Sequence, residues 1–406
     1  MTLSERYVDL AKANDMGSQF SISLWATYFI YAYSNIFFLL SVYLSDIGLS
    51  LRVSGWVLAS FYVGTTFIRP FGGWVLERFG LRKTLLVAGI ISLFGALGVF
   101  FSLPSVPCMI FYRAIGGVGY GIYLVGLTTH QSFILSESVR GSRFGWITVL
   151  TILPLATLSP LGGWFLRKGF VELYFFISPV AALCCIVLGL LLKMPSEGVD
   201  VPKIEWGSWK ELLCLKGVHL LVVSTLLFAL ANAFFLSVSG FFSEKGLNPA
   251  VFLWANALVC LVLRGLGGRI LDRWDRRRMA APVTILMAIV ILVAIGADSD
   301  LELLILGSLF GLGLGFGFPV HLALISDLTP PRLRPKGTAL GWFFMDAGWF
   351  ISPLLVGYLA SLVGEECALR LLSLAILACS AVVFFLWERF VRFVPELNAD
   401  VSRKGA

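Results

Sequence analysis

Twelve apolar stretches, each long enough to cross a lipid bilayer, run through this chain of 406 residues. A spanning helix needs about 20 apolar residues. Hydrophobic residues make up 58% of the chain and charged residues only 14%, whereas a soluble domain is about a quarter charged. The pattern therefore predicts an all-α membrane protein. The predicted spans are residues 19–45, 53–77, 83–103, 106–135, 142–166, 171–193, 217–242, 249–272, 279–297, 301–326, 337–362 and 368–390.

One connection between spans is both long and polar, and it runs from Pro195 to Lys216. It divides the twelve spans into two groups of six. We therefore predict a cytoplasmic arm, a first six-helix bundle, a cytoplasmic linker, a second six-helix bundle and a cytoplasmic tail. Their predicted ranges are 1–18, 19–193, 194–216, 217–390 and 391–406.

The positive charges are distributed unevenly across the predicted membrane. With both termini in the cytoplasm, all but eight of the 31 Lys and Arg residues fall in cytoplasmic segments. Three of the eight, Arg69, Arg113 and Arg264, lie within spans. Because Lys and Arg concentrate on the cytoplasmic side of membrane proteins, we predict a multi-pass protein of the cytoplasmic (inner) membrane with both termini inside.

The chain also contains an internal duplication. The stretch from Arg69 to Lys83 is repeated from Arg264 to Arg278, with a glycine pair, an acidic residue and basic residues at matching positions. Repeated six-helix units that run parallel place a substrate site between the halves, near the middle of the membrane. The duplication thus predicts a transporter with pseudo-symmetric halves. We also expect it to be a monomer.

The loop after the second span reads Gly73-x-x-x-Glu77-Arg78-x-Gly80-x-Arg82-Lys83. It resembles the signature loop of the major facilitator superfamily, whose usual form is G-x-x-x-D-[RK]-x-G-[RK]-[RK]. This copy has Glu for Asp and Leu81 at the first late basic position. The second copy keeps Gly268, Asp272 and Arg273 but has Asp275 in place of the second glycine.

The resemblance implies a cytoplasmic gate. We expect the basic residues of these loops to reach Glu137 and Asp327, at the cytoplasmic ends of the fourth and tenth spans. Such contacts would stabilise the outward-open state and break for inward opening. The alternative is that Arg78, Arg82 and Lys83 only hold the loop inside.

Two further patterns resemble motifs of proton-linked members of the superfamily. Arg113-x-x-x-Gly117-x-Gly119-x-Gly121 resembles an arginine-plus-glycine motif, which implies that Arg113 influences protonation of a nearby carboxylate. Its alternative role is to hydrogen-bond backbone carbonyls inside the membrane. Ser159-Pro160-Leu-Gly-Gly163 resembles the G-P-x-x-G motif of exporters, with serine for the first glycine. An ordinary proline kink is the alternative.

Asp346 is the one carboxylate well inside a predicted span. An aspartate that moves between an apolar site and an arginine can take up and release a proton, so Asp346 is the first candidate for proton coupling. A static salt bridge with Arg264 or Arg69 is the alternative. His321 is a second candidate because histidine titrates near physiological pH.

Arg69 and Arg264 are related by the duplication. Facing a cavity, they would bind a carboxylate or phosphate on the substrate; facing other helices, they would be structural. Other polar or aromatic groups within spans are further candidates for substrate binding, although aromatic residues often face lipid. These are Tyr31, Asn35, Tyr120, Tyr123, Asn232 and Asn256.

No G-x-x-x-x-G-K-[ST] motif for ATP is present, and the cysteines lack metal-binding spacing. We therefore expect a transporter and not an enzyme, with no cofactor, metal or nucleic-acid partner. The leading prediction is proton-coupled export of a small anionic, zwitterionic or amphipathic solute. Proton-coupled uptake of an organic anion is one alternative, and a transport-silent sensor or scaffold is another.

Overall fold

All the regular secondary structure in the described part of the chain is helical. The computed structural model describes residues 3–134, 140–193, 208–266, 275–330 and 333–393. The first group of helices is α1 (Leu3–Asn35), η1 (Ile36–Leu39), α2 (Leu40–Asp46), α3 (Leu51–Phe79), α4 (Leu81–Phe101), α5 (Val106–Ile134), α6 (Arg140–Arg167) and α7 (Val171–Leu191). The second is α8 (Trp209–Cys214), α9 (Val218–Asn232), α10 (Phe235–Glu244), α11 (Pro249–Leu266), α13 (Arg276–Ala294), α14 (Asp300–Leu328), α15 (Arg334–Val363) and α16 (Glu365–Phe393).

Eleven helical segments among the described residues are long and apolar enough to cross a membrane. A twelfth, shorter apolar helix covers Pro249–Gly265 in α11, and α11 is followed directly by residues 267–274, which are not described. The prediction of an all-α protein with twelve spans is confirmed. The helix of the first span begins far earlier than predicted, because α1 continues through the predicted arm from Leu3.

The first span of each group is broken, which the sequence did not predict. In the first group a single 3-10 turn, η1, separates α1 from α2 just after Asn35. In the second, α9 ends at Asn232 and α10 begins at Phe235. Broken helices form the binding sites of many transporters because their freed polar groups face a cavity. Each break here places an asparagine inside the protein, and both side chains are buried.

The described part of the predicted linker contains a short helix, α8. Ser208 accepts a hydrogen bond from the backbone N–H of Glu211, and the Glu211 carboxylate accepts one from the Ser208 N–H. This reciprocal pair is a capping box, and Leu212 of the helix is fully buried. The sequence contained the signal, Ser-x-x-Glu before apolar residues, but the prediction treated the segment only as a polar connection.

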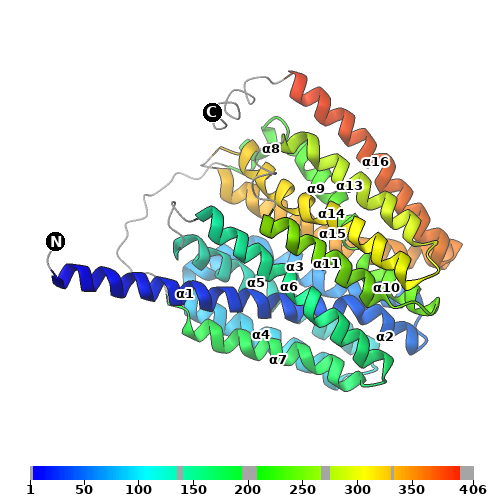
Figure 1. The fold of residues 1–406 in the computed structure, drawn as a ribbon, viewed down its shortest axis with the longest axis horizontal. Coiled ribbons are helices and arrows are strands. Elements are labelled where there is room, and N and C mark those ends of the chain that lie inside the picture. The colour runs from blue at the N-terminus through cyan, green and yellow to red at the C-terminus, as the bar shows by residue number, and fades with distance from the viewer. Residues whose placement is uncertain (1–2, 135–139, 194–207, 267–274, 331–332, 394–406) are drawn as a thin grey trace.

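The helices pack as two bundles whose internal contacts match. In the first bundle α3 packs on α5, α4 on α5 and α7, and α1 on α6 and α7. In the second, α11 packs on α14, α13 on α14 and α16, and α9 on α15 and α16. Figure 1 shows α1 to α7 on one side of the molecule and α9 to α16 on the other. The repeated sequence thus corresponds to a repeated packing arrangement.

The two bundles meet along three helix pairs: α3 with α15, α6 with α11, and α2 with α10. We call the end of the bundles where α7 stops at Leu191 and α8 starts the linker end. The opposite end, where α2 and α10 stop at Asp46 and Glu244, is the far end.

Glycines allow the backbones of α3 and α5 to touch. A Cβ added at Gly117 would meet the carbonyl oxygen of Phe61, and one at Gly64 would meet that of Ala114. The equivalent pair in the second bundle uses Gly307 of α14 against the backbone of Phe252 in α11. Small residues at such crossings are typical of membrane helices because they permit close van der Waals packing.

We expect Gly117→Ala to destabilise the protein, because its methyl group would push α5 away from α3. Overpacking of this kind costs about 1–3 kcal/mol, and a lower midpoint of thermal unfolding in detergent would reveal it. Gly265→Ala is the matched control, since no atom lies within 4 Å of a Cβ there. If both variants unfold at the wild-type temperature, the α3–α5 contact contributes no stability.

Candidate functional site

A cavity of about 100 Å³ lies between the two bundles. Six of the eight residues predicted to bind substrate line it: Tyr31, Asn35, Arg69, Tyr120, Asn232 and Arg264. Asp346, the predicted proton-coupling residue, lines it as well. The structure therefore brings together residues from both repeats that lie up to about 300 positions apart in the sequence.

An ion pair joins the two bundles across this cavity. Nε of Arg69, on α3, donates to Oδ2 of Asp346, on α15, at 2.5 Å, and Nη2 donates to Oδ1 at 3.3 Å. Each side chain is only 7% exposed. The Arg69 guanidinium also lies over the Trp342 ring, 4.7 Å from its centroid. Of the two arginines that the sequence offered as partners of Asp346, the structure selects Arg69.

Arg264 is the second arginine of the cavity, and it has a different environment. Its Nη1 donates to the carbonyl oxygen of Thr148 and to the hydroxyl of Thr151, both at 2.9 Å. These contacts connect α11 to α6 across the bundle interface. Its Nε is buried and has no hydrogen-bond partner among the described residues. No carboxylate in the described part of the chain forms an ion pair with it.

The cavity therefore carries a positive charge that no described residue compensates. Arg69 and Asp346 neutralise each other. Among the described residues, the charge of Arg264 is met only by neutral oxygens and by the Phe318 ring, 5.1 Å from its guanidinium carbon. A buried charge without a counter-ion is costly. An anionic group entering this cavity would be stabilised by Arg264.

The asparagines at the two helix breaks contribute polar groups to the cavity. Asn35 accepts a hydrogen bond from the Ser34 hydroxyl at 3.2 Å. Oδ1 of Asn232 is buried and has no hydrogen-bond partner in the part of the chain that the structure describes. An unpaired buried acceptor costs about 1–3 kcal/mol, so Asn232 offers a site for a donor on a ligand.

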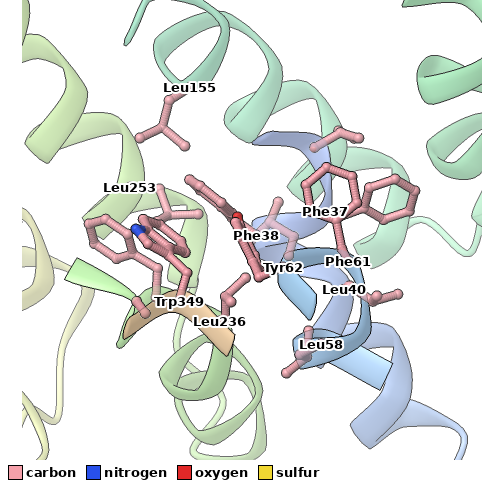
Figure 2. Packing of buried hydrophobic residues seen from close by; sticks show 14 of the residues in the cluster. Phe37, Phe38, Leu40, Leu58, Phe61, Tyr62, Leu155, Leu236, Leu253 and Trp349 are labelled. Carbon is pink, nitrogen blue, oxygen red and sulfur yellow. The ribbon is translucent and has the colours of Figure 1, made fainter. Parts of the chain in front are cut away.

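Stacked aromatic rings close the cavity on the side of the far end. The Trp349 ring lies between those of Phe38 and Tyr62, with centroid distances of 5.2 and 5.0 Å. Figure 2 shows these three residues converging from different helices. They come from η1, α3 and α15, so the stack crosses the bundle interface. All three residues are buried, with at most 8% of each exposed.

Beyond the stack, the far ends of the two bundles are in direct contact. The backbone N–H of Gly240 in α10 donates to the hydroxyl of Ser41 in α2 at 2.9 Å. The Ser45 hydroxyl donates to the Glu244 carboxylate. On the next helix pair, a Cβ added at Gly357 of α15 would lie 2.6 Å from the carbonyl oxygen of Leu51. The structure is thus in a state closed at the far end.

Two residues predicted to bind substrate do not line the cavity. Tyr123 is fully buried between α5 and α7, where its hydroxyl donates to the carbonyl oxygen of Cys185 at 2.8 Å. Asn256 is buried where α11 packs on α14, and its Nδ2 has no partner. Periodicity alone did not indicate which face of α5 or α11 meets the cavity, and these two residues lie on faces packed against helices of their own bundle.

Arg113 also lies outside the cavity lining. Its Nε donates to the carbonyl oxygen of Val57 in α3 at 2.9 Å, and its guanidinium lies over Phe37, 4.5 Å from the ring centroid. It forms no ion pair with a carboxylate of the described residues. This geometry matches the alternative stated from the sequence, a hydrogen bond to backbone inside the membrane. An effect of Arg113 on proton coupling stays a prediction.

His321 occupies a packed position within the second bundle. Its Nε2 lies 3.1 Å from the Ser224 hydroxyl and its Nδ1 lies 2.8 Å from the carbonyl oxygen of Gly317. Its ring stacks on Phe228 with a centroid distance of 4.6 Å. Both ring nitrogens are therefore engaged away from the cavity, and Asp346 is the better placed of the two coupling candidates.

The predicted gate in the first half is described only in part. Gly73 and Glu77 lie in α3 but are described only by their backbone, and Glu137 is outside the described residues. Gly80 separates α3 from α4 with φ +74, a conformation that favours glycine. Arg78 and Arg82 are exposed.

In the second half Gly268, Asp272 and Arg273 fall outside the described residues. The basic residues that follow them are paired with acids of their own bundle. Arg276 binds Asp327 at the end of α14 with Nη1–Oδ2 of 3.0 Å, and Arg278 binds Glu388 of α16 at 3.3 Å. Asp275 caps α13 by accepting from the Arg277 N–H. The predicted contact between this basic cluster and Asp327 is therefore present, although it joins helices within one bundle.

The Pro160 segment lies at the bundle interface. Pro160 is inside α6, and a Cβ added at Gly163 would lie 2.8 Å from the Cβ of Ala250 in α11. The glycine therefore permits α6 and α11 to approach near the far end. This position suits a segment that changes contacts when the bundles move.

Several residues that line the cavity were not among the predicted site residues, and three of them illustrate why. Thr151 holds Arg264, Phe318 lies beside the same guanidinium, and Trp349 forms the centre of the aromatic stack. Trp349 follows Asp346 by three positions and therefore lies on the same face of α15, which is a usable signal. Nothing in the sequence distinguishes Thr151 or Phe318 from similar residues elsewhere.

The fold and the central cavity define a membrane transporter built from two repeated bundles. The model of the Major Facilitator Superfamily matches residues 20–279 and 221–404 of the chain. The chain belongs to this superfamily and is a multi-pass secondary transporter of small molecules, not an enzyme.

Among curated proteins, the chain is similar to Multidrug resistance protein 2 of Bacillus subtilis (strain 168). The two are 23% identical over 333 residues, which cover 76% of this chain and 82% of that protein. It is also similar to Quinolone resistance protein NorA of Staphylococcus aureus (strain N315), with 24% identity over 159 residues. That match covers 39% of this chain and 40% of NorA.

Proposed function

We propose that this protein exports a small organic solute from the cytoplasm in exchange for protons, by alternating access to the central cavity. The observation that carries the proposal is the ion pair between Arg69 and Asp346, which joins the two bundles inside that cavity. Both termini are then cytoplasmic and the far end faces outside, as the distribution of basic residues predicts.

The ion pair supplies a physical rule for coupling. Removing one partner of a buried pair is strongly unfavourable because it leaves the other charge uncompensated. When Asp346 takes up a proton, Arg69 is left charged in a buried site without a counter-ion. Separation of the bundles relieves this cost because water then reaches Arg69. The empty, deprotonated protein is therefore held in one state, and only a proton or a cargo that replaces the ion pair lets the bundles move.

Two observations support export over uptake. The relatives named above are resistance proteins. The segment around Pro160, which resembles an exporter motif, lies where α6 meets α11 at the bundle interface. In this proposal the basic loops at the linker end form the gate that closes when the far end opens.

Flux in proteoliposomes tests the proposed function. Purified protein is reconstituted with a pH-sensitive dye inside, and a panel of anionic, zwitterionic and cationic solutes is offered under a pH gradient. We expect at least one solute to move against the direction of proton flow and to accelerate that flow. Movement in the same direction as protons would replace export with uptake, and absence of both flows from folded protein would exclude transport.

A further inference from the structure

Two residues that line the cavity each carry a buried polar atom that has no hydrogen-bond partner among the described residues, and the two atoms are of opposite character. Nε of Arg264 is a charged donor on α11, and Oδ1 of Asn232 is a neutral acceptor at the break between α9 and α10. Both residues line the same cavity of about 100 Å³. Buried polar groups in proteins are almost always paired, so these two residues are the first candidates for polar contacts to a bound solute.

The chemistry of these atoms specifies the ligand. Arg264 requires an anionic acceptor, and a carboxylate fits a guanidinium with one free N–H edge. Asn232 requires a donor, and a protonated amine fits an amide oxygen. Asp346 supplies a second acceptor for the same amine, because its carboxylate lines the cavity too. Tyr31 lines the cavity together with Arg69, Arg264 and Asp346, so the charged groups surround one small space.

Exchange of cargo for protons at Asp346 determines which arginine, Arg69 or Arg264, binds the anionic group of the cargo. A carboxylate on Arg69 would leave Asp346 without its counter-ion and favour its protonation, so cargo and proton would bind together, as in symport. A carboxylate on Arg264 leaves Asp346 ionised, so the cargo's ammonium can displace Arg69 from it. The cargo's ammonium then competes with the proton for Asp346, and competition is what exchange requires. The other groups around Asp346 that can titrate are Tyr31, Tyr62 and Tyr120.

We propose that the cargo is a small zwitterion of the amino-acid class, whose carboxylate binds Arg264 and whose ammonium group binds Asn232 and Asp346. This inference rests on the proposed export function and adds the substrate class to it. The size of the cavity agrees, because about 100 Å³ is well below the 300–1,000 Å³ typical of pockets for drug-sized ligands.

The test is equilibrium binding to the purified full-length protein, which needs no proton gradient. The probes are glycine, leucine and tryptophan, each compared with its methyl ester, which lacks the carboxylate, and its N-acetyl derivative, which lacks the ammonium. We expect at least one amino acid to bind about tenfold or more tightly than both of its derivatives, as loss of one charged contact predicts.

The variants assign the two charges to residues. Arg264→Gln should weaken the amino acid and its N-acetyl derivative by about tenfold or more and leave the ester unchanged. Asn232→Ala should weaken the amino acid and the ester but not the N-acetyl derivative. Asn256→Ala is the matched control, because Asn256 is a buried asparagine with an unpaired amide atom outside the cavity. If Arg264→Gln does not fold, Arg264→Lys is used instead. It keeps the charge, so it should weaken the amino acid and the N-acetyl derivative by less than Arg264→Gln would, again with no change for the ester.

The inference is overturned if none of the amino acids binds, if the derivatives bind as tightly as the amino acids, or if Arg264→Gln weakens all three probes equally. These outcomes differ from failure of the proposed function. A protein that exchanges organic cations for protons but ignores zwitterions would keep the export function and lose only this substrate class.

Discussion

Asp346→Asn should abolish accumulation of cargo driven by a pH gradient while leaving downhill exchange of cargo intact. The asparagine cannot take up or release a proton, so proton binding can no longer drive transport. Because asparagine is also neutral, no ion pair between Arg69 and position 346 holds the bundles together. It keeps an oxygen that accepts hydrogen bonds, so cargo still binds. In proteoliposomes we expect the proton-driven component to fall to the level of protein-free vesicles, whereas counterflow of labelled cargo continues.

The control for this prediction is Asp298→Asn. Asp298 also pairs with a cation, Lys245, at 3.3 Å, but it is exposed in a loop at the far end. This variant should keep wild-type accumulation. If Asp346→Asn retains the full pH dependence of the wild type, Asp346 is not the proton carrier and the role passes to another group, with His321 the next candidate.

A disulfide across the far end should stop transport completely. Ser41 and Gly240 face each other between α2 and α10, and a Cβ added at Gly240 would lie 3.3 Å from the Cβ of Ser41. This is close to the separation of about 3.5–4.5 Å found in disulfides. Oxidised Ser41→Cys/Gly240→Cys should therefore be held in the state closed at the far end. We expect no flux above background after oxidation and recovery on reduction.

The single variants Ser41→Cys and Gly240→Cys control for effects of oxidation on the seven native cysteines, which are all unpaired. They should transport equally well in the oxidised and reduced states. Wild-type flux from a fully cross-linked double variant would show that the far end does not open during transport, and alternating access would have to be abandoned.

The membrane spans were predictable because the hydrocarbon core imposes their length on the sequence. The breaks at Asn35 and Asn232 were not. The residues of η1, Ile36 to Leu39, are as apolar as the helices around them, and no Gly or Pro marks the change. Irregular backbone is tolerated inside the membrane only where it lines a cavity or is buried in protein. The position of the cavity depends on how the bundles pack, which the sequence of these segments does not indicate.

The sequence was sufficient to predict which residue types form the site, but not which of those residues contact one another. A carboxylate and two arginines inside membrane spans are expected to pair with other charged or polar groups. The duplication indicated that the two arginines lie in equivalent places. Yet Arg69 and Asp346 are far apart in the chain, and only the packing of α3 on α15 decides that Arg69, and not Arg264, is the partner. The same packing turns Tyr123 and Asn256 away from the cavity.

The most direct measurement of the central claim is the distance between the bundles at each end as the pH changes. Spin labels at Ile47 and Val363 report on the far end, and labels at Lys83 and Arg392 report on the linker end; all four positions are exposed. We predict that acidification populates longer far-end and shorter linker-end distances, and that Asp346→Asn shows this population at every pH. Distances that ignore both pH and the substitution would contradict proton-coupled alternating access through the Arg69–Asp346 pair.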